Sequence, residues 1–434
     1  MQTNQQTRAA IAGVSGTVLQ WYDFSLFGYL APIIAKTYFP KVNQFIALLS
    51  TFGVFAVGFL LAPLGALWLG HLGDKYGRKY VLTLTVICIS ISTAAIAFLP
   101  SYAQIGMLAP IGLTLCRLLQ GLVSSAEFAG SAIFLVEHAP VNKKSFFGSL
   151  ASFSYTAGMI IGAGVCSLLT AKFMPHWAWR CSFVLAVFGA WIVLYLRHRV
   201  AETPEFTHLI DQHAAVKLPI VNVLKQALVP FIITIALAAF IGIYTYGTYV
   251  YMVTYLHVYL YWSLAFVTGI VTLALIADTV TEPIIAYLTE RYGRLKMMLL
   301  GTLLTLVLML PIFKCLTATN PWLVGGALVM ISLLIALAYA HANAFMVELF
   351  PVNCRFSGFS VAFNIGITIF GGTTPMVMTW LIHTTQHLFA PAFYYLAAST
   401  LGLIAISFAA YWQNKSSHWL SAAQPVGKYP SGNN

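Results

Sequence analysis

The stretch GHLGDKYGRK at residues 70–79 returns in altered form as AYLTERYGRLK at 286–296. A second pair is closer: FLVEHAPVNKK at 134–144 and FMVELFPVNCR at 345–355 share Phe, Val, Glu, Pro, Val, Asn and a final basic residue. The offsets are 216 and 211 residues, so two independent echoes have nearly one spacing. This indicates a chain built from two copies of one unit.

The composition predicts a membrane protein. Of 434 residues, 60% are hydrophobic and only 8% are charged, and the mean hydropathy is +0.84, whereas soluble domains have roughly 25% charged residues. Apolar runs of about 20 residues are long enough to cross a bilayer as a helix. We expect twelve such spans, at 9–35, 43–69, 80–98, 104–136, 145–171, 179–198, 220–256, 262–288, 296–316, 321–347, 356–385 and 389–412.

The repeat divides these spans into two sets of six. We expect an all-α membrane protein with an N-terminal six-helix bundle at 1–198 and a C-terminal bundle at 220–412. The polar segment 199–219 is the expected linker, and 413–434 is the expected tail. The first span could be mistaken for a signal peptide, but it is long, lacks a clear cleavage site and contains Gln20 and Asp23.

The distribution of basic residues predicts the topology. With the N-terminus inside, sixteen of the 22 Lys and Arg residues lie on the cytoplasmic side, five lie outside, and Arg117 is within the membrane. This asymmetry follows the positive-inside rule and explains the net charge of +11 without a nucleic-acid partner. We expect a multi-pass protein of the bacterial inner membrane with both termini in the cytoplasm.

No cofactor or metal ion is expected. The six cysteines are scattered singly, without a C-x-x-C pair, and are interpreted as small buried residues. His383 and His387 are four residues apart, but no acidic or thiol third ligand is nearby, so an outer-end loop is favoured. The chain has no phosphate-binding loop and no H-E-x-x-H motif, which argues against an enzyme or receptor.

The chain resembles the major facilitator superfamily and, within it, the metabolite:proton symporters, which include proline/betaine, shikimate, α-ketoglutarate and citrate transporters. The resemblance covers the whole chain and implies two six-helix bundles that move about a central site. We expect a monomer that binds a small molecule and protons within the bilayer. The motifs that carry the resemblance are QWYDFSLFG, GHLGDKYGRK, RLLQGLVSSAEFAGSAIFLVEHAP, WAWRCSF, AETPEF and ELFPVNCRFSGFSVAFNIGITIFGGTTP.

Asp23 is the first candidate for proton coupling. An ionisable side chain within the membrane is costly and usually has a partner. Asp23 lies thirteen residues from Lys36 and Arg117 thirteen from Gln104, so both are about 20 Å from the outer ends of their helices. We expect Arg117 to pair with Asp23 and to release it when an anionic substrate binds, although a fixed structural pair is the alternative.

The predicted span at 104–136 carries further polar residues on the face of Arg117. Gln120, Ser124, Glu127 and Ser131 follow it at steps of three and four. The stripe predicts a lining of the transport pathway with Glu127 as a second proton site; ordinary hydrogen bonding between helices is the alternative. Gln20 and Tyr22, next to Asp23, are also expected to contact substrate.

The second half supplies other candidate substrate contacts. Asp278 and Glu282 are four residues apart on one face of the predicted span at 262–288, although Glu282 could instead snorkel or cap near Pro283. The predicted span at 220–256 presents three tyrosines, Tyr244, Tyr251 and Tyr255, that could form an aromatic wall, even for a quaternary ammonium group. The remaining candidates, His341 and Asn364, are single polar residues that could equally bond a neighbouring helix.

The repeated motifs are expected to form a gate. Gly77 and Gly293 would permit the tight turns, while acidic and basic residues at the helix ends bridge in one conformation and part in another. A solvated loop that serves only topology is the alternative. The charged gate residues are Asp74, Arg78, Glu137, Glu290, Arg294, Glu348 and Arg355.

These features predict secondary active transport, with proton-coupled symport of a small metabolite by alternating access. One membrane arginine against four membrane acids suits a monocarboxylate or a zwitterion, such as an amino acid or betaine, better than a tricarboxylate. Proton-coupled efflux of a drug-like or siderophore-like compound is the same-fold alternative.

Overall fold

The computed structural model describes residues 2–40, 54, 61–171, 173–211 and 219–415. Within these ranges every regular element is a helix, which confirms the predicted all-α class. Ten helical segments of the described chain are long and apolar enough to cross a membrane. They correspond to the third to twelfth predicted spans.

The first two predicted spans differ from the other ten. The run predicted at 9–35 forms α1 (Gln2–Tyr29) and α2 (Ala31–Tyr38), which are separated at Leu30. A proline in the first turn of α2 fits this break, because its missing N–H is not needed there. Most of the predicted span at 43–69 lies outside the described residues, and α4 (Ala62–Tyr76) is its described end.

The rest of the N-terminal half, which we define as α1–α9, contains four long helices and two short ones. Its remaining elements are α5 (Arg78–Phe98), α6 (Tyr102–Ile105), α7 (Leu108–His138), η1 (Val141–Lys143), α8 (Lys144–Leu169) and α9 (Trp179–His198). Two short helices then flank residues 212–218. The first, α10 (Pro204–Asp211), lies in the predicted linker at 199–219, whereas the second, α11 (Pro219–Gln226), begins at its last residue and occupies the start of the predicted span at 220–256.

The C-terminal half, α12–α20, has more interruptions. Its helices are α12 (Leu228–Tyr246), α13 (Met252–Thr254), α14 (Leu264–Tyr292), α15 (Arg294–Leu316), α16 (Pro321–Tyr339), α17 (Ala342–Glu348), α18 (Arg355–Gly366), α19 (Gly372–Thr385) and α20 (Ala390–Lys415). A 3-10 turn, η4 (Val352–Cys354), precedes α18. Most of the predicted tail, at 416–434, lies outside the described residues.

Three of the interruptions are π-helical turns. They are η2 (Gly247–Tyr251), η3 (Tyr255–Tyr259) and η5 (Ile367–Gly371). Near them the backbones approach closely, since a Cβ added to Gly242 would lie 3.0 Å from Cα of Gly371. Small residues allow such contact between helices in membranes, so α12 and η5 form one packed unit.

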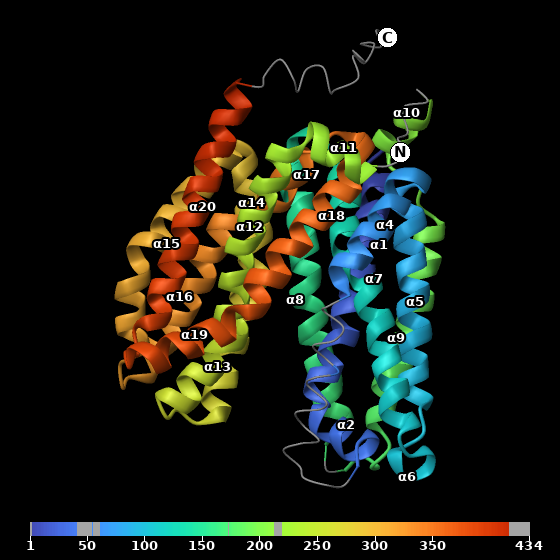
Figure 1. The fold of residues 1–434 in the computed structure, drawn as a ribbon, viewed down its shortest axis with the longest axis vertical. Helices are drawn as coiled ribbons and strands as arrows, with labels where there is room; N and C mark the ends of the chain where they lie inside the picture. Colours follow the sequence, from blue (N-terminus) through green and yellow to red (C-terminus); the bar gives the residue numbers. More distant parts are fainter. Residues whose placement is uncertain (1, 41–53, 55–60, 172, 212–218, 416–434) are drawn as a thin grey trace.

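The two halves meet along α8, α14 and α18. Figure 1 shows α15, α16 and α20 on one side, α5 and α9 on the other, and α8 and α18 between them. The N-terminus, α10 and α11 lie at one end of the molecule, and α2 and α6 lie at the opposite end (Figure 1). We call the end with α10 and α11 the closed end, because the halves are hydrogen-bonded to each other there.

Candidate transport site and gate

At the closed end, an acid of the N-terminal half caps a helix of the C-terminal half. The Asp74 carboxylate accepts hydrogen bonds from the backbone N–H groups of Phe356 at 3.0 Å and Ser357 at 2.8 Å. These N–H groups belong to the first turn of α18. The N–H groups of a first turn have no hydrogen-bond acceptors within their own helix. Arg78 completes the contact by donating to the carbonyl of Val352 at 2.9 Å.

The same arrangement occurs with the halves exchanged. Glu290 accepts a hydrogen bond from the backbone N–H of Ser145 in the first turn of α8, and Arg294 donates to the Ser145 hydroxyl at 2.7 Å. Asp74 and Glu290 occupy equivalent positions of the repeat, as do the starts of α8 and α18. Each half therefore caps a helix of the other half.

Buried ion pairs reinforce the closed end. Glu137 lies between two arginines, 3.3 Å from Nε of Arg78 and 3.0 Å from Arg355. Glu205 of α10 pairs with Arg355 and lies 3.6 Å from Lys144. Every predicted gate charge lies in this cluster. Its other ion pairs join Arg294 to Glu348, Lys144 to Glu348, Arg78 to Asp74 and Arg294 to Glu290.

The two glycines of the repeated loops have the conformation that the tight-turn prediction requires. Gly77 has φ of 109° and Gly293 has φ of 93°, values that disfavour any residue with a Cβ. Their surroundings differ. A Cβ at Gly77 would lie 2.2 Å from Oε2 of Glu202, whereas one at Gly293 would meet open space.

Two acids at the closed end lie outside the predicted spans and have altered pKa values. Burial raises the pKa of Asp74 to about 6, although Arg78 and the N–H groups of Ser357 and Phe356 act in the opposite direction. Burial also raises the pKa of Glu202, against the hydrogen bonds from Lys79 and Thr203. Of these two acids, Asp74 accepts hydrogen bonds from the opposite half, whereas the partners of Glu202 lie outside the C-terminal half, so separation of the halves changes the surroundings of Asp74 directly.

The structure places Asp23 and Arg117 together inside the N-terminal half. Arg117 Nη1 lies 4.0 Å from Oδ2 of Asp23 and donates to Gln120 at 2.9 Å. Asp23 also accepts hydrogen bonds from Gln120 and Thr93, both at 2.8 Å. Both carboxylate oxygens are thus acceptors, which is the pattern of an ionised acid.

Three predicted substrate contacts are bonded within the N-terminal half instead. Gln20 donates to the carbonyl of Ser124, Tyr22 donates to the carbonyl of Ser182, and Gln120 is held by Asp23 and Arg117. The guanidinium of Arg117 lies 3.7 Å from the ring centre of Phe27. These contacts give no support to a substrate anchor at Arg117 in this conformation.

Glu127 likewise has a partner that the sequence interpretation did not identify. Its carboxylate forms an ion pair with Arg197 of α9 and a hydrogen bond with Thr85 of α5, and both charged side chains are buried. Ser131, one turn further, donates to the carbonyl of Gly13. The stripe on α7 therefore joins helices of one half, as in the alternative interpretation.

A cavity of about 80 Å³ lies between the halves. Asp278 and Glu282 line it on α14, and aromatic rings line it from both halves. Its lining residues come from α1, α7, α8, α12, α14, α16, α18 and η5 and are Trp21, Phe128, Ser152, Tyr155, Thr156, Ile241, Thr245, Tyr246, Asp278, Glu282, Tyr339, Phe363 and Ile367.

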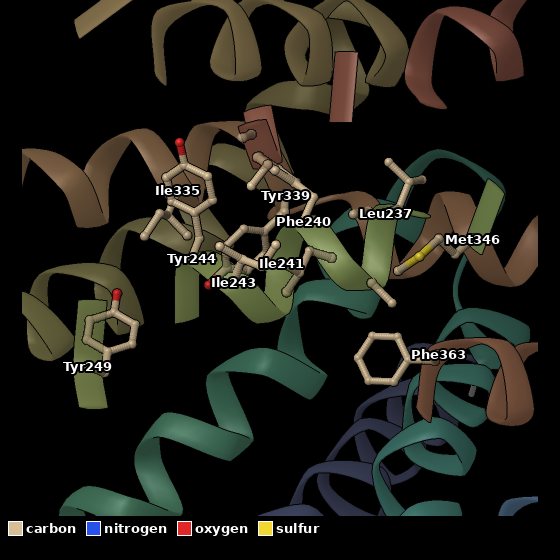
Figure 2. Close-up of a cluster of buried hydrophobic side chains, with 14 of the residues drawn as sticks. Leu237, Phe240, Ile241, Ile243, Tyr244, Tyr249, Ile335, Tyr339, Met346 and Phe363 are labelled. Carbon is tan, nitrogen blue, oxygen red and sulfur yellow. The ribbon is translucent and has the colours of Figure 1, made fainter. Parts of the chain in front are cut away.

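The predicted tyrosine wall faces elsewhere. Tyr244 bonds Ser399 at 2.6 Å, and Tyr255 donates to the carbonyl of Leu388 at 2.8 Å, so both are fixed inside the C-terminal half. Tyr251 is buried beside Tyr255. Figure 2 shows Tyr244 in a buried cluster with Phe240. The spacing predicted a shared face, but the cavity is on the side of Tyr246.

The last two predicted contacts also lie outside the cavity lining. His341 is buried at the start of α17, with Nδ1 at 3.3 Å from the Thr289 hydroxyl. Asn364 donates to the carbonyl of Ser125 at 3.0 Å and thereby links α18 to α7 across the halves. Asn343 makes a similar link by donating to the Ser152 hydroxyl at 3.0 Å.

Several cavity residues were missed by sequence reasoning. Trp21 lies inside the motif QWYDFSLFG, but nothing in this motif indicated that its side chain lines a cavity. Tyr155 and Tyr339 are tyrosines in largely apolar helices, where an aromatic residue is not by itself a sign of a cavity. Arg197, at the end of the predicted span at 179–198, is one of the sixteen basic residues counted on the cytoplasmic side, and its pairing with Glu127 and its exposure of only 3% were not predicted.

Two halves that share a cavity and are closed at one end define a carrier. The model of the Major Facilitator Superfamily matches residues 13–351 and 235–431, and the chain belongs to this superfamily. The protein is thus a secondary transporter of a small molecule rather than an enzyme, and the predicted twelve-helix fold in two six-helix bundles is confirmed.

Two curated relatives are similar to this chain over most of its length. It is 32% identical over 412 residues to the proline/betaine transporter of Escherichia coli K12, covering 92% of this chain and 82% of that protein. It is 31% identical over 410 residues to the glycine betaine/proline/ectoine/pipecolic acid transporter OusA of Dickeya dadantii, with the same coverage.

Solved structures share the fold at low identity. The proton:xylose symporter XylE bound to 6-bromo-6-deoxy-D-glucose has a TM-score of 0.75 and 15% identity, with 94% of this chain and 96% of that chain covered. The transporter FucP in its outward conformation has a TM-score of 0.69 and 15% identity, with 92% and 98% covered.

Proposed function

We propose that this protein is a proton-coupled symporter that takes up a small metabolite with an ammonium group, of the proline or betaine type. The observation that carries the proposal is the cavity between the halves, where two acids face aromatic rings. Such a cavity suits a positively charged organic group. The names of the relatives, which include proline/betaine transporters, support this substrate class.

The conformation fits one state of an alternating-access cycle. We infer that the closed end faces the cytoplasm, because most basic residues of the predicted topology are on that side. The cavity then serves the outer side of a bacterial inner membrane. Bundles at 1–198 and 220–412, a cytoplasmic linker at 199–219, a cytoplasmic tail at 413–434 and a monomeric carrier complete the proposal.

Asp23 is the proposed site of the coupled proton. Its carboxylate is buried. Thr93 and Gln120 donate hydrogen bonds to it, and the Arg117 cation lies beside it. A proton on Asp23 removes one acceptor, so these groups must reorganise. Gln120 also holds Arg117, and protonation is thereby connected to the packing of α1 against α7.

The test is transport by the purified protein in liposomes. Radiolabelled glycine betaine and proline are offered outside, with an acidic exterior or with no pH gradient. We expect accumulation above the external concentration only with the gradient, and collapse of accumulation when a protonophore is added. Exit of substrate against its gradient, driven by inward proton flow, would instead establish the efflux alternative.

A further inference from the structure

The two acids of the cavity differ in what surrounds their oxygens. Asp278 is 1% exposed and Glu282 is fully buried. Oδ2 of Asp278 accepts a hydrogen bond from the Tyr339 hydroxyl at 3.4 Å. Oδ1 of Asp278 and both carboxyl oxygens of Glu282 have no hydrogen-bond partner among the described residues. Because buried carboxyl groups normally have partners, these three oxygens are arranged for a molecule that enters the cavity.

The groups that face the two acids from neighbouring helices are neutral. Ser152 of α8 approaches Glu282. In the described part of the chain, no Lys, Arg or His forms an ion pair with either acid. The titratable groups near Asp278 are the phenols of three tyrosines, from α16, η2 and α8: Tyr339, Tyr249 and Tyr155.

One negative charge is the stable ionisation state of this pair. Two adjacent carboxylates disfavour each other, and an apolar wall does not compensate them. Hydrogen-bond donors stabilise the ionised form of an acid. The Tyr339 hydroxyl serves Asp278 in this way, whereas Glu282 has no such donor among the described residues. The charge therefore belongs on Asp278 and the proton on Glu282, whose carboxyl group is then a hydrogen-bond donor.

The N-terminal side of the cavity offers a second donor. Nε1 of Trp21 is buried without a hydrogen-bond partner among the described residues, although the ring lines the cavity. Trp21 packs edge-to-face on Tyr155, with ring centres 4.3 Å apart. Aromatic faces attract ammonium groups, and an indole N–H donates to oxygen. The cavity thus presents one negative charge, two donors and aromatic rings, which together match a zwitterion.

We propose that ionised Asp278 holds the ammonium group of the substrate, while protonated Glu282 and the indole N–H of Trp21 donate to its carboxylate. Side chains one helical turn apart have Cβ atoms about 5–6 Å apart, so both acids can reach one small zwitterion. This inference rests on the proposed function and deepens it, because it assigns each charge of the substrate to a residue. Glu282 keeps its proton when the substrate binds, so Asp23 remains the coupled site.

Three probes of matched shape separate the two charges. Glycine betaine has both, choline has the ammonium group with a hydroxyl in place of the carboxylate, and 3,3-dimethylbutanoate has the carboxylate with carbon in place of nitrogen. Binding is measured on the purified full chain in lipid nanodiscs by thermal stabilisation, which needs no transport and no gradient. We expect glycine betaine to bind at least about tenfold more tightly than either of the others, since each lacks one recognised charge.

Variants of the two acids should have unequal effects. Asp278→Asn removes the charge, so it should weaken glycine betaine and choline at least about tenfold and leave 3,3-dimethylbutanoate no weaker. Glu282→Gln keeps a neutral group with a donor, so the affinities of glycine betaine and choline should stay within about threefold of the wild type. Thr272→Val, on the exposed side of α14, is the matched control.

Removal of either donor should affect only the ligand that has a carboxylate. Glu282→Met and Trp21→Phe should each weaken glycine betaine about tenfold and leave choline unchanged, because hydrogen bonds to charged groups contribute about that much. Proton movement is measured in the Asp23→Asn background, which removes the coupled proton. There, glycine betaine should bind between about pH 6 and pH 8 with constant affinity and without proton release into weakly buffered solution.

Loss of choline binding in Glu282→Gln as large as in Asp278→Asn would overturn the assignment. So would release of a proton by glycine betaine in Asp23→Asn, or wild-type binding of 3,3-dimethylbutanoate as tight as that of glycine betaine. If the cavity variants fail to fold, the order of the three probes on the wild-type protein decides. No binding of glycine betaine or proline overturns the proposed substrate class and this inference together, whereas the expected binding pattern without pH-driven uptake contradicts only the proposed coupling.

Discussion

The carboxylate of Asp74 accepts a 2.8 Å hydrogen bond from the backbone N–H of Ser357, which lies in the other half of the chain. The repeat places Glu290 in the equivalent position, and it accepts from Ser145 of the N-terminal half. Opening of this end exposes the first turns of α8 and α18 together. The two caps therefore make separation of the halves at this end a concerted step.

Asp74→Asn should shift the carrier away from this conformation. The Asp74 carboxylate accepts with both oxygens, whereas the amide of asparagine keeps one acceptor oxygen and turns an NH2 donor toward the other backbone N–H at the start of α18. A buried donor that loses its acceptor costs about 1–3 kcal/mol, so the ratio of closed to open ends should fall about tenfold. Spin labels at Lys75→Cys and Lys296→Cys measure the separation, and Arg291→Gln, an exposed charge on α14, is the control.

The same labels test a pH dependence. The pKa of Asp74 is raised to about 6 in the closed end, whereas an exposed aspartate titrates near 3.9. Ionisation therefore costs the closed state stability above about pH 6, and this cost disappears as the pH falls toward 4. We expect the closed population to increase on acidification. A response that persists in Asp74→Asn would assign the effect to other groups.

Asp23→Asn should separate exchange from accumulation. The amide mimics the protonated acid, so exchange of substrate between two loaded sides survives, because no proton needs to leave. Accumulation driven by a pH gradient should be abolished. Reconstituted vesicles measure both, with Thr114→Val on α7 as the control, since its hydroxyl bonds only its own helix. Full accumulation in Asp23→Asn would reduce the acid to a structural role.

The buried pair of Glu127 and Arg197 should contribute to stability rather than to coupling. Arg197→Met leaves a buried carboxylate without its cation and should cost about 3–5 kcal/mol, seen as a lower thermal midpoint in detergent. The double variant Glu127→Gln with Arg197→Met should recover much of the loss. If Glu127→Gln alone keeps its stability but loses pH-driven uptake, Glu127 is a coupling residue after all.

Gly77→Ala and Gly293→Ala make a matched pair. Both force alanine into positive φ with extended ψ, 159° at Gly77 and 132° at Gly293, at a cost of about 1–3 kcal/mol. Only Gly77→Ala also places its Cβ 2.2 Å from Oε2 of Glu202. The thermal midpoint should therefore fall further for Gly77→Ala. Equal midpoints for the two variants would show that Glu202 moves away without cost.

The sequence was sufficient to predict the helices and the charges that lie together at the closed end, and the physical reason is that both depend on patterns along the chain. Apolar runs identify spans, and the repeat identifies equivalent loops, so the gate charges were found together with the glycine turns. The cavity lining depends instead on which side of each helix faces the other half. In a membrane helix that is apolar all round, such as α12, hydrophobic periodicity carries no signal of that side.

The side of a helix that faces the other half was also the limit for individual residues. Tyr244 and Tyr246 are two residues apart on one helix, and only the packing against α20 shows that the first is interior and the second faces the cavity. Asp278 and Glu282 were identified because charge in a span is rare and needs a reason. The burial of Arg197 was not predicted, because basic residues near the end of a span are also typical of the exposed charges that determine membrane topology.

The π-helical turns in the second half alter how its helices can be compared with others. An extra residue in a turn displaces all later side chains around the helix axis by about 100°. Between Gly247 and Tyr259 this happens twice, and it happens again at Ile367–Gly371. A relative that lacks one of these turns presents different residues to the cavity from aligned positions, so substrate preference can diverge while the aligned residues remain identical.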